Sequence, residues 1–237
     1  MRASFRSLQP TMLSVFVAMT LLTACGKHQG DEEGGAQGNG QPDAAAQARE
    51  DAASTAKCED NPLAQSLPPK ETVGGLPFLL RDCASDSIRA VYGTHGGRQI
   101  EISMTDTSPP PAAGDQAAQQ DLNRRTRDMQ RSTSRAAIEM LTAMTDPMQT
   151  SADALAAIGG PDYAPILVPT ATKDSFIVHV TAKTQVGPAE ALALFKDRYM
   201  VTLQASDNGS ALTGLTTPQA QALYLPFIQA FHPERLP

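Results

Sequence analysis

Tryptophan is absent from this 237-residue chain, and aromatic residues make up only 5% of it. A core with so few large rings has to be filled mainly by Leu, Ile, Val, Met and Ala. The length is sufficient for one domain of ordinary size and a linker. The composition therefore predicts a single aliphatic-rich domain.

Motifs of the common enzyme classes are missing too. The sequence contains no nucleophile elbow, HExxH helix, P-loop or dinucleotide-binding fingerprint. Its histidines are His28, His95, His179 and His232, and none shares a predicted helix with another at i, i+4 spacing. We therefore expect no metal site and no cofactor, and we assign no catalytic residue.

An excess of positive charge is also lacking. The formal net charge is −6, and charged residues make up 19% of the chain. A mildly acidic protein has no bulk attraction for nucleic acid or anionic lipid. We therefore expect no nucleic-acid partner.

No apolar run at the N-terminus is long enough for an ordinary membrane span. Residues 12–22 form an apolar stretch about half the ~20 residues that a spanning helix needs. Arg2 and Arg6 precede this stretch, so residues 1–24 have the order of charged and apolar regions found in an export signal. The export signal of an ordinary secreted protein would have almost the same sequence up to Ala24. The residue that distinguishes this chain from such a protein is Cys25.

Leu22-Thr23-Ala24-Cys25 resembles the lipobox of bacterial lipoproteins, in which a branched apolar residue and two small residues precede the lipidated cysteine. The resemblance implies cleavage before Cys25, a diacylglycerol thioether on its sulfur and a further acyl chain on the new amino terminus. Two or more acyl chains give a stable membrane anchor. In a Gram-negative host, Gly26 in place of aspartate implies sorting to the outer membrane, with the domain in the periplasm.

The segment after the cysteine has low sequence complexity. Residues 26–57 contain no aromatic and no branched aliphatic residue, so they lack the apolar surface needed to form a core. As a flexible coil, 32 residues would span roughly 30 Å, although the alanine-rich part favours a transient helix. The sequence thus divides into a signal peptide (1–24), a lipidated cysteine and flexible tether (25–57), and one domain (58–237).

Two cysteines remain when Cys25 carries lipid. Cys58 and Cys83 form an even pair in an exported protein, which favours a disulfide bond. The alternative is a redox or metal-binding pair, but the CxxC spacing and a nearby histidine cluster are missing. We expect a structural disulfide.

Alternating apolar and polar residues predict strands at 88–93 and 98–105, joined by a hairpin turn at 93–97. A glycine-rich loop can also bind phosphate, but that geometry needs a following helix. Further strands are predicted at 166–168, 175–183 and 198–206, the first of them at a sheet edge because prolines flank it.

Helical spacing and caps predict four helices, over residues 116–145, 151–158, 187–195 and 217–231. In the longest, a stripe at helical spacing is predicted to face the core; it comprises Leu122, Thr126, Met129, Thr133, Ala137, Met140 and Met144. The resulting fold class is α+β, a mostly antiparallel sheet of four to five strands packed by helices on one face, after a disordered N-terminal tether.

Two surfaces are candidates for binding a ligand or partner. Arg124, Arg131 and Arg135 follow one side of the long helix, where a basic face could meet an anionic surface such as lipid headgroups or peptidoglycan. The alternative is a solvated face on which arginines pair with nearby acidic residues.

The second candidate surface is the outer sheet face. Strand alternation places these polar residues on it: Gln99, Glu101, Ser103, His179, Thr181, Lys183, Arg198, Thr202 and Gln204. Glu101, His179 and Ser103 could supply an acid, a base and a nucleophile, although any solvated sheet face carries polar residues.

Two functions follow from these surfaces. The first is a membrane-anchored periplasmic lipoprotein with a non-enzymatic binding or protein-interaction role, whose partner is an envelope protein or the cell wall. The alternative is an envelope hydrolase acting on peptidoglycan or lipid.

Overall fold

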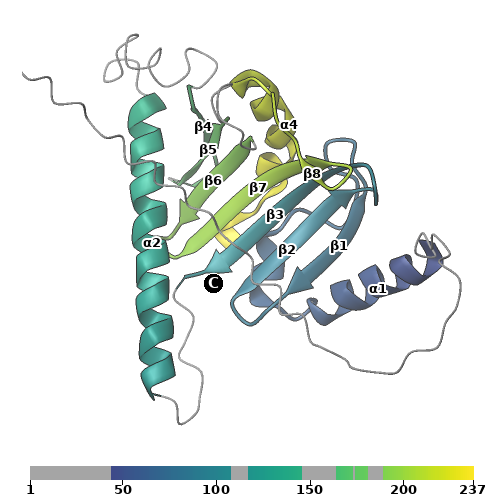
Figure 1. Cartoon of the computed structure of the whole chain (residues 1–237), viewed down its shortest axis with the longest axis horizontal. Coiled ribbons are helices and arrows are strands. Elements are labelled where there is room, and N and C mark those ends of the chain that lie inside the picture. The colour runs from purple at the N-terminus through teal and green to yellow at the C-terminus, as the bar shows by residue number, and fades with distance from the viewer. Residues whose placement is uncertain (1–43, 108–116, 146–163, 173, 181–188) are drawn as a thin grey trace, which may run out of the picture. The chain divides into compact units, whose positions relative to one another are not determined.

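The computed structural model describes residues 44–107, 117–145, 164–172, 174–180 and 189–237 (Figure 1). The lipobox with Cys25, the predicted helix at 151–158, and Thr181 and Lys183 lie outside these residues. No helix in the described ranges has the length and apolarity needed to cross a membrane.

A single antiparallel sheet organises the described residues. Its order is β1-β2-β3-β7-β6-β5-β4, and the short strand β8 pairs with β7. The strands are β1 (Phe78–Cys83), β2 (Ser87–Gly93), β3 (Arg98–Asp106), β4 (Ile166–Pro169), β5 (Ser175–His179), β6 (Glu190–Phe195), β7 (Tyr199–Asp207) and β8 (Ser210–Ala211). The predicted α+β class is confirmed, and the sheet has eight strands instead of four to five.

The β2–β3 hairpin forms where alternation predicts it. Ile88, Ala90 and Tyr92 are buried on the inner face, together with Ile100, Ile102 and Met104. Gly93 ends β2 with a φ of 126°, and a Cβ at this position would lie 2.1 Å from the Arg98 carbonyl oxygen. The turn therefore requires glycine at this position.

The inner face of the sheet is covered by α4 (Thr217–Ala230). Phe231, which follows α4, packs edge-on against Phe176 and at a tilt against Phe195, at centroid distances of 5.6 and 5.4 Å, and Phe227 packs against Tyr92 at 5.2 Å. The helix begins at Thr217, and Thr216 is its N-cap and forms a capping box with Gln219.

The rings of the core also make polar contacts at their hydroxyl ends. The Tyr92 hydroxyl donates to the Pro68 carbonyl oxygen at 2.8 Å. Burial raises the pKa of Tyr92 to about 12, so this phenol remains protonated as a donor near neutral pH. The Tyr224 hydroxyl donates in the same way to the Ala189 carbonyl oxygen at 2.6 Å. The first bond joins β2 to the segment before β1, and the second joins α4 to the residue before β6.

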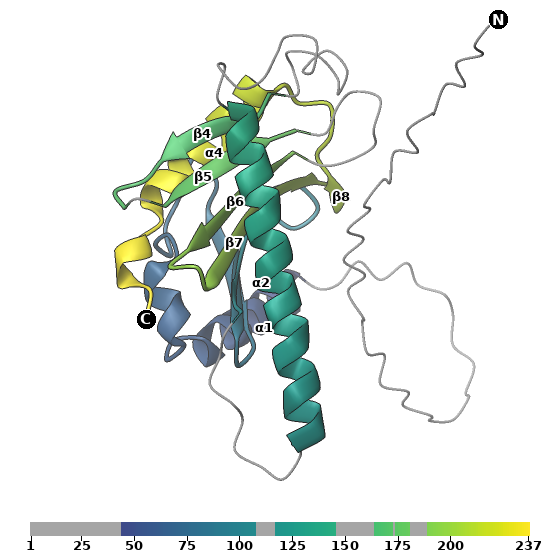
Figure 2. The ribbon, with the colours of Figure 1, turned by 90° about the vertical axis from the view of Figure 1, so that its left-hand side faces the viewer.

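The long helix α2 (Ala117–Thr145) lies on the opposite face of the sheet, across β4–β7 (Figure 2). Ser134 donates from α2 to the sulfur of Met200, an outward residue of β7, at 2.9 Å. Leu141 of α2 and Ile177 of β5 are buried on this side. The helices thus divide between the two faces of the sheet, where one covered face was expected.

The prediction of a helix over 187–195 is wrong for the described residues of this range, because residues 190–195 form strand β6. Ala191, Ala193 and Phe195 are buried on the inner face, while the intervening leucines turn toward α2. A strand covered on both faces loses the alternation that distinguishes it in sequence. The same double burial explains why the run Glu190–Phe195 has an almost continuous apolar pattern.

The expectation of a flexible tether up to residue 57 is also wrong. Residues 44–57 form helix α1 (Ala44–Lys57), which lies beside the edge strand β1. The Thr55 hydroxyl accepts a hydrogen bond from the Arg81 backbone N–H at 2.9 Å, and Asp51 contacts His95 at 2.6 Å. Alanine has the highest helix propensity, and these contacts to the sheet hold the helix. The folded domain therefore includes α1 and does not begin at Cys58.

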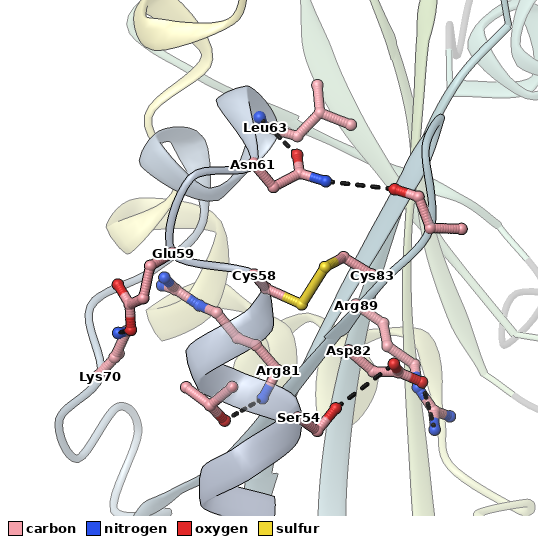
Figure 3. The surroundings of a disulfide bond; sticks show 12 residues. Ser54, Cys58, Glu59, Asn61, Leu63, Lys70, Arg81, Asp82, Cys83 and Arg89 are labelled. Atoms are coloured by element: carbon pink, nitrogen blue, oxygen red, sulfur yellow. Dashed lines mark hydrogen bonds and ion pairs between the residues drawn. A yellow bond between two sulfur atoms is a disulfide. The ribbon is translucent and has the colours of Figure 1, made fainter.

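The predicted disulfide between Cys58 and Cys83 is confirmed (Figure 3). It joins the residue that follows α1 to the last residue of β1, with a Cα–Cα distance of 5.7 Å. Asn61 caps the short helix η1 (Pro62–Ser66) by accepting from Leu63, and it donates to the Ala84 carbonyl oxygen at 3.3 Å. Together these bonds fix α1 and η1 to the edge of the sheet, where β1 would otherwise expose unpaired backbone groups.

Candidate interaction surface

Helix α2 has one side against the sheet and one side in solvent. Arg127, Ser134, Ile138 and Leu141 lie on the sheet side and are buried or half-buried. Among the exposed residues of the solvent side, six lie along one line of the helix, and we call them the outward seam: Thr126, Met129, Thr133, Ala136, Met140 and Ala143.

The stripe predicted to face the core is therefore wrong in most of its described members. Thr126, Met129, Thr133 and Met140 point away from the sheet, and only Ala137 and Met144 are half-buried. The side chain of Leu122 lies outside the description. The side of α2 that faces the sheet instead carries both polar and apolar residues. Its polar residues bond to the sheet and its turns, as Arg127 does to Asp86 at 3.1 Å.

Two methionines give the outward seam its apolar character. Met129 is 66% exposed and Met140 is 60% exposed, and with Leu167 they are the large apolar side chains that the described residues leave in solvent. Single exposed apolar residues are ordinary on protein surfaces. Two flexible methionines on one side of a helix, with small residues between them, instead resemble surfaces that pack against other helices.

The arginines of α2 are paired with aspartates. Arg125 and Arg124 both contact Asp121, the first at 2.7 Å, and Arg131 contacts Asp128 at 2.8 Å. Arg135 donates from Nε to Asp197 in the β6–β7 turn at 2.9 Å. The structure therefore shows the paired, solvated arrangement on this helix, and a continuous basic patch for an anionic surface is not formed by these arginines.

Glu101 and His179 do share the outer face of the sheet, as alternation predicts. The strand register places Glu101 opposite Gln204, Gln204 opposite Glu190, and Glu190 opposite His179. Three strand spacings separate Glu101 from His179, a distance of about 14 Å at the usual spacing between strands.

The acid, base and nucleophile suggested by the sequence are consequently not assembled. Ser103 donates to Glu101 at 2.7 Å. His179 lies 3.7 Å from Glu190, beyond hydrogen-bonding distance, and Gln204 donates to Glu190 at 2.7 Å. These contacts form a polar row across the sheet in which no hydroxyl is close to the imidazole.

Arg198 is absent from that row, contrary to the prediction. It precedes β7 and donates two hydrogen bonds to the buried carboxylate of Asp106, at 2.8 and 2.6 Å. This pairing raises the pKa of Arg198. Its carbonyl oxygen also accepts from the Thr107 backbone at 3.0 Å. Arg198 therefore fastens the start of β7 to the end of β3, and its guanidinium is already engaged within the protein.

The described residues contain no cluster of His, Cys, Asp or Glu arranged to hold a metal ion. Two shallow depressions lie on the surface. One is apolar and runs between α1 and β1, lined by Ala52, Phe78 and Leu79 among others, and the second adjoins α2 beside Arg131, Ser132 and Arg135. The second brings Arg131 and Arg135 together with Asp197, whereas Arg124 lies nearer the N-terminus of the helix.

Searches against protein-family models, curated proteins and solved structures found no match to this chain. The outward seam is visible in the sequence as a periodic stripe, but periodicity alone does not say which side of a helix faces its own domain. The burial of individual α2 residues determines which side of the helix faces the sheet.

Proposed function

We propose that this chain is a membrane-anchored periplasmic lipoprotein with a non-enzymatic protein-interaction role in the cell envelope, and that the outward seam of α2 is its interaction surface. The observation that carries the proposal is the exposure of Met129 and Met140 on one side of a 29-residue helix. Removing such side chains from water is favourable by roughly 25 cal/mol per Å² of apolar surface, before the entropic and desolvation costs of association are subtracted.

The location of the protein is supported by two features at separate places in the chain. The stretch Leu22-Thr23-Ala24-Cys25 follows a charged and then an apolar segment, as in bacterial lipoproteins. The disulfide between Cys58 and Cys83 suits an oxidising compartment such as the periplasm. With Gly26 after the cysteine, we place the anchor in the outer membrane of a Gram-negative host.

The interaction role is tested by capturing the partners of the protein in cells that produce it with an intact seam or with a substituted seam. In full-length protein crosslinked in intact cells, the double substitution Met129→Glu and Met140→Glu should reduce the yield of the dominant captured envelope protein by more than about tenfold, because two carboxylates would be buried in an apolar contact. Mass spectrometry of the purified adducts gives the yield.

A matched control adds the same charge elsewhere. Ala53→Glu and Thr142→Glu alter exposed helix residues outside the seam, so this variant should capture the same protein as the unmodified chain. Equal capture by the seam variant and the control variant would contradict the assignment of α2 as the interaction surface.

A further inference from the structure

We propose that the partner bound by the outward seam is a second copy of this chain, joined through an antiparallel pair of α2 helices. The inference rests on the proposed function, because it uses the same surface and names its occupant. Three properties of α2 support it: the spacing of the seam, the charges beside the seam, and the size of the contact.

The spacing of the seam is that of a coiled-coil contact. From Thr126 to Ala143 the six residues follow one another at intervals of 3, 4, 3, 4 and 3 residues. This alternation is the heptad pattern by which two helices pack side by side. When two α2 helices overlap along their whole length in antiparallel fashion, Thr126 faces Ala136 of the second copy, and Met129 faces Thr133.

The charges beside the seam select this direction. Arg125, Ser132 and Glu139 occupy one flank at intervals of seven residues. In the antiparallel pair, Arg125 lies beside Glu139 of the second copy, and the twofold symmetry repeats this contact. In a parallel in-register pair, this flank would instead face the other flank of the second copy, so Arg125 would lie beside Gln130 and Glu139 beside Met144, and no opposite charges would meet.

The local environment neutralises the Arg125 charge only in part. Its side chain is 76% exposed, and it shares the single carboxylate of Asp121 with Arg124. Arg135 in the other half of the helix is bound to Asp197 instead. The N-terminal half of α2 thus has an excess of positive charge, which complements Glu139 in the C-terminal half of a second copy.

The size of the contact predicts a weak dimer that depends on the membrane. A helix of 29 residues is about 43 Å long. A contact strip roughly 10 Å wide along this length covers on the order of 400 Å² per copy, about half the area of a standard stable interface. Confinement of two anchored copies to one membrane raises their effective concentration, so association is favoured there over free solution.

The test uses the full-length chain in the membranes of cells that produce it. Ser132 lies next to the proposed twofold axis, so Ser132→Cys should form a disulfide-linked dimer under mild oxidation. The two copies of residue 140 would be about 27 Å apart along the helix axes, so Met140→Cys should give at least about tenfold less dimer. Equal crosslinking from both positions would overturn the antiparallel register.

Charge reversal provides a second readout that a folding defect would not reproduce. In the Ser132→Cys background, Arg125→Glu alone and Glu139→Arg alone should each reduce the dimer by about tenfold, because like charges then meet at both symmetry-related contacts between residues 125 and 139. Combining Arg125→Glu with Glu139→Arg should restore it. Dimer yields that are unaffected by single reversal, or that are not restored by the double reversal, would overturn the proposal.

The same experiment separates this inference from the proposed function. If Ser132→Cys forms an adduct with a different envelope protein and none with a second copy, the dimer is overturned and the interaction role of the seam stands. If Ser132→Cys forms no adduct and the Met129→Glu, Met140→Glu variant captures partners normally, both proposals are overturned.

Discussion

Replacing Phe227 by alanine is expected to lower the free energy of unfolding by about 3–5 kcal/mol. The ring is 1% exposed and packs edge-on against Tyr92 at a centroid distance of 5.2 Å. A Cβ added at Gly74 would lie 3.2 Å from the Phe227 ring, so the neighbouring turn also fits closely against it. Truncation would leave a cavity between α4 and the sheet that the surrounding backbone cannot readily fill.

Chemical denaturation followed by circular dichroism measures this effect. Met140→Ala is the matched control, because Met140 is 60% exposed and its truncation should change the stability by less than about 0.5 kcal/mol. A cost for Phe227→Ala below about 1 kcal/mol would show that α4 does not close the core as described.

Loss of the disulfide is expected to have the next largest effect. Substituting serine for both Cys58 and Cys83 should lower the free energy of unfolding by about 3 kcal/mol. The unfolded serine variant has more conformational entropy, because its chain is no longer closed into a loop between two residues 25 positions apart. The loss of local stability should be greatest in α1. Without the disulfide, that helix retains only noncovalent contacts to the sheet and its turns, such as Thr55 with Arg81 and Asp51 with His95.

Hydrogen exchange measured by mass spectrometry locates this change. Peptides from α1 should exchange faster in the serine variant, while peptides from β3 and β7 at the centre of the sheet should keep their relative protection. A Ser54→Ala variant, which removes only an exposed contact to Asp82, serves as the control. Unchanged exchange of α1 in the serine variant would mean that the helix is held by its noncovalent contacts alone.

Much of the sheet could be predicted, because several strands bury only one of their two faces and therefore alternate between apolar and polar residues. The β2–β3 hairpin and β7 alternate in this way, and glycine-rich turns mark their ends. β6 could not be recognised, because α2 covers its second face and removes the alternation. For α1 the sequence predicts only a transient helix, since the stability of this helix depends on a disulfide and on contacts with β1 and His95, which are distant in sequence.

The candidate surfaces show the same limit. Alternation correctly placed Glu101 and His179 on one sheet face, but their separation depends on β7 and β6 lying between β3 and β5. Helical periodicity identified a stripe on α2 but not the side of the helix that faces the sheet. That side is set by polar contacts opposite the stripe, such as Arg127 with Asp86 and Ser134 with Met200. Long-range polar contacts of this kind leave no periodic signal in the sequence.

Whether this protein acts from a lipid anchor is tested most directly by the mass of its mature N-terminal peptide, measured on protein from membrane and soluble fractions. We predict a peptide that begins at Cys25 and carries acyl chains, recovered from the outer membrane, and we predict that Cys25→Ala moves the protein out of the membrane fraction. An unmodified Cys25 within a soluble chain, or membrane association that survives Cys25→Ala, would contradict the anchor and the envelope role built on it.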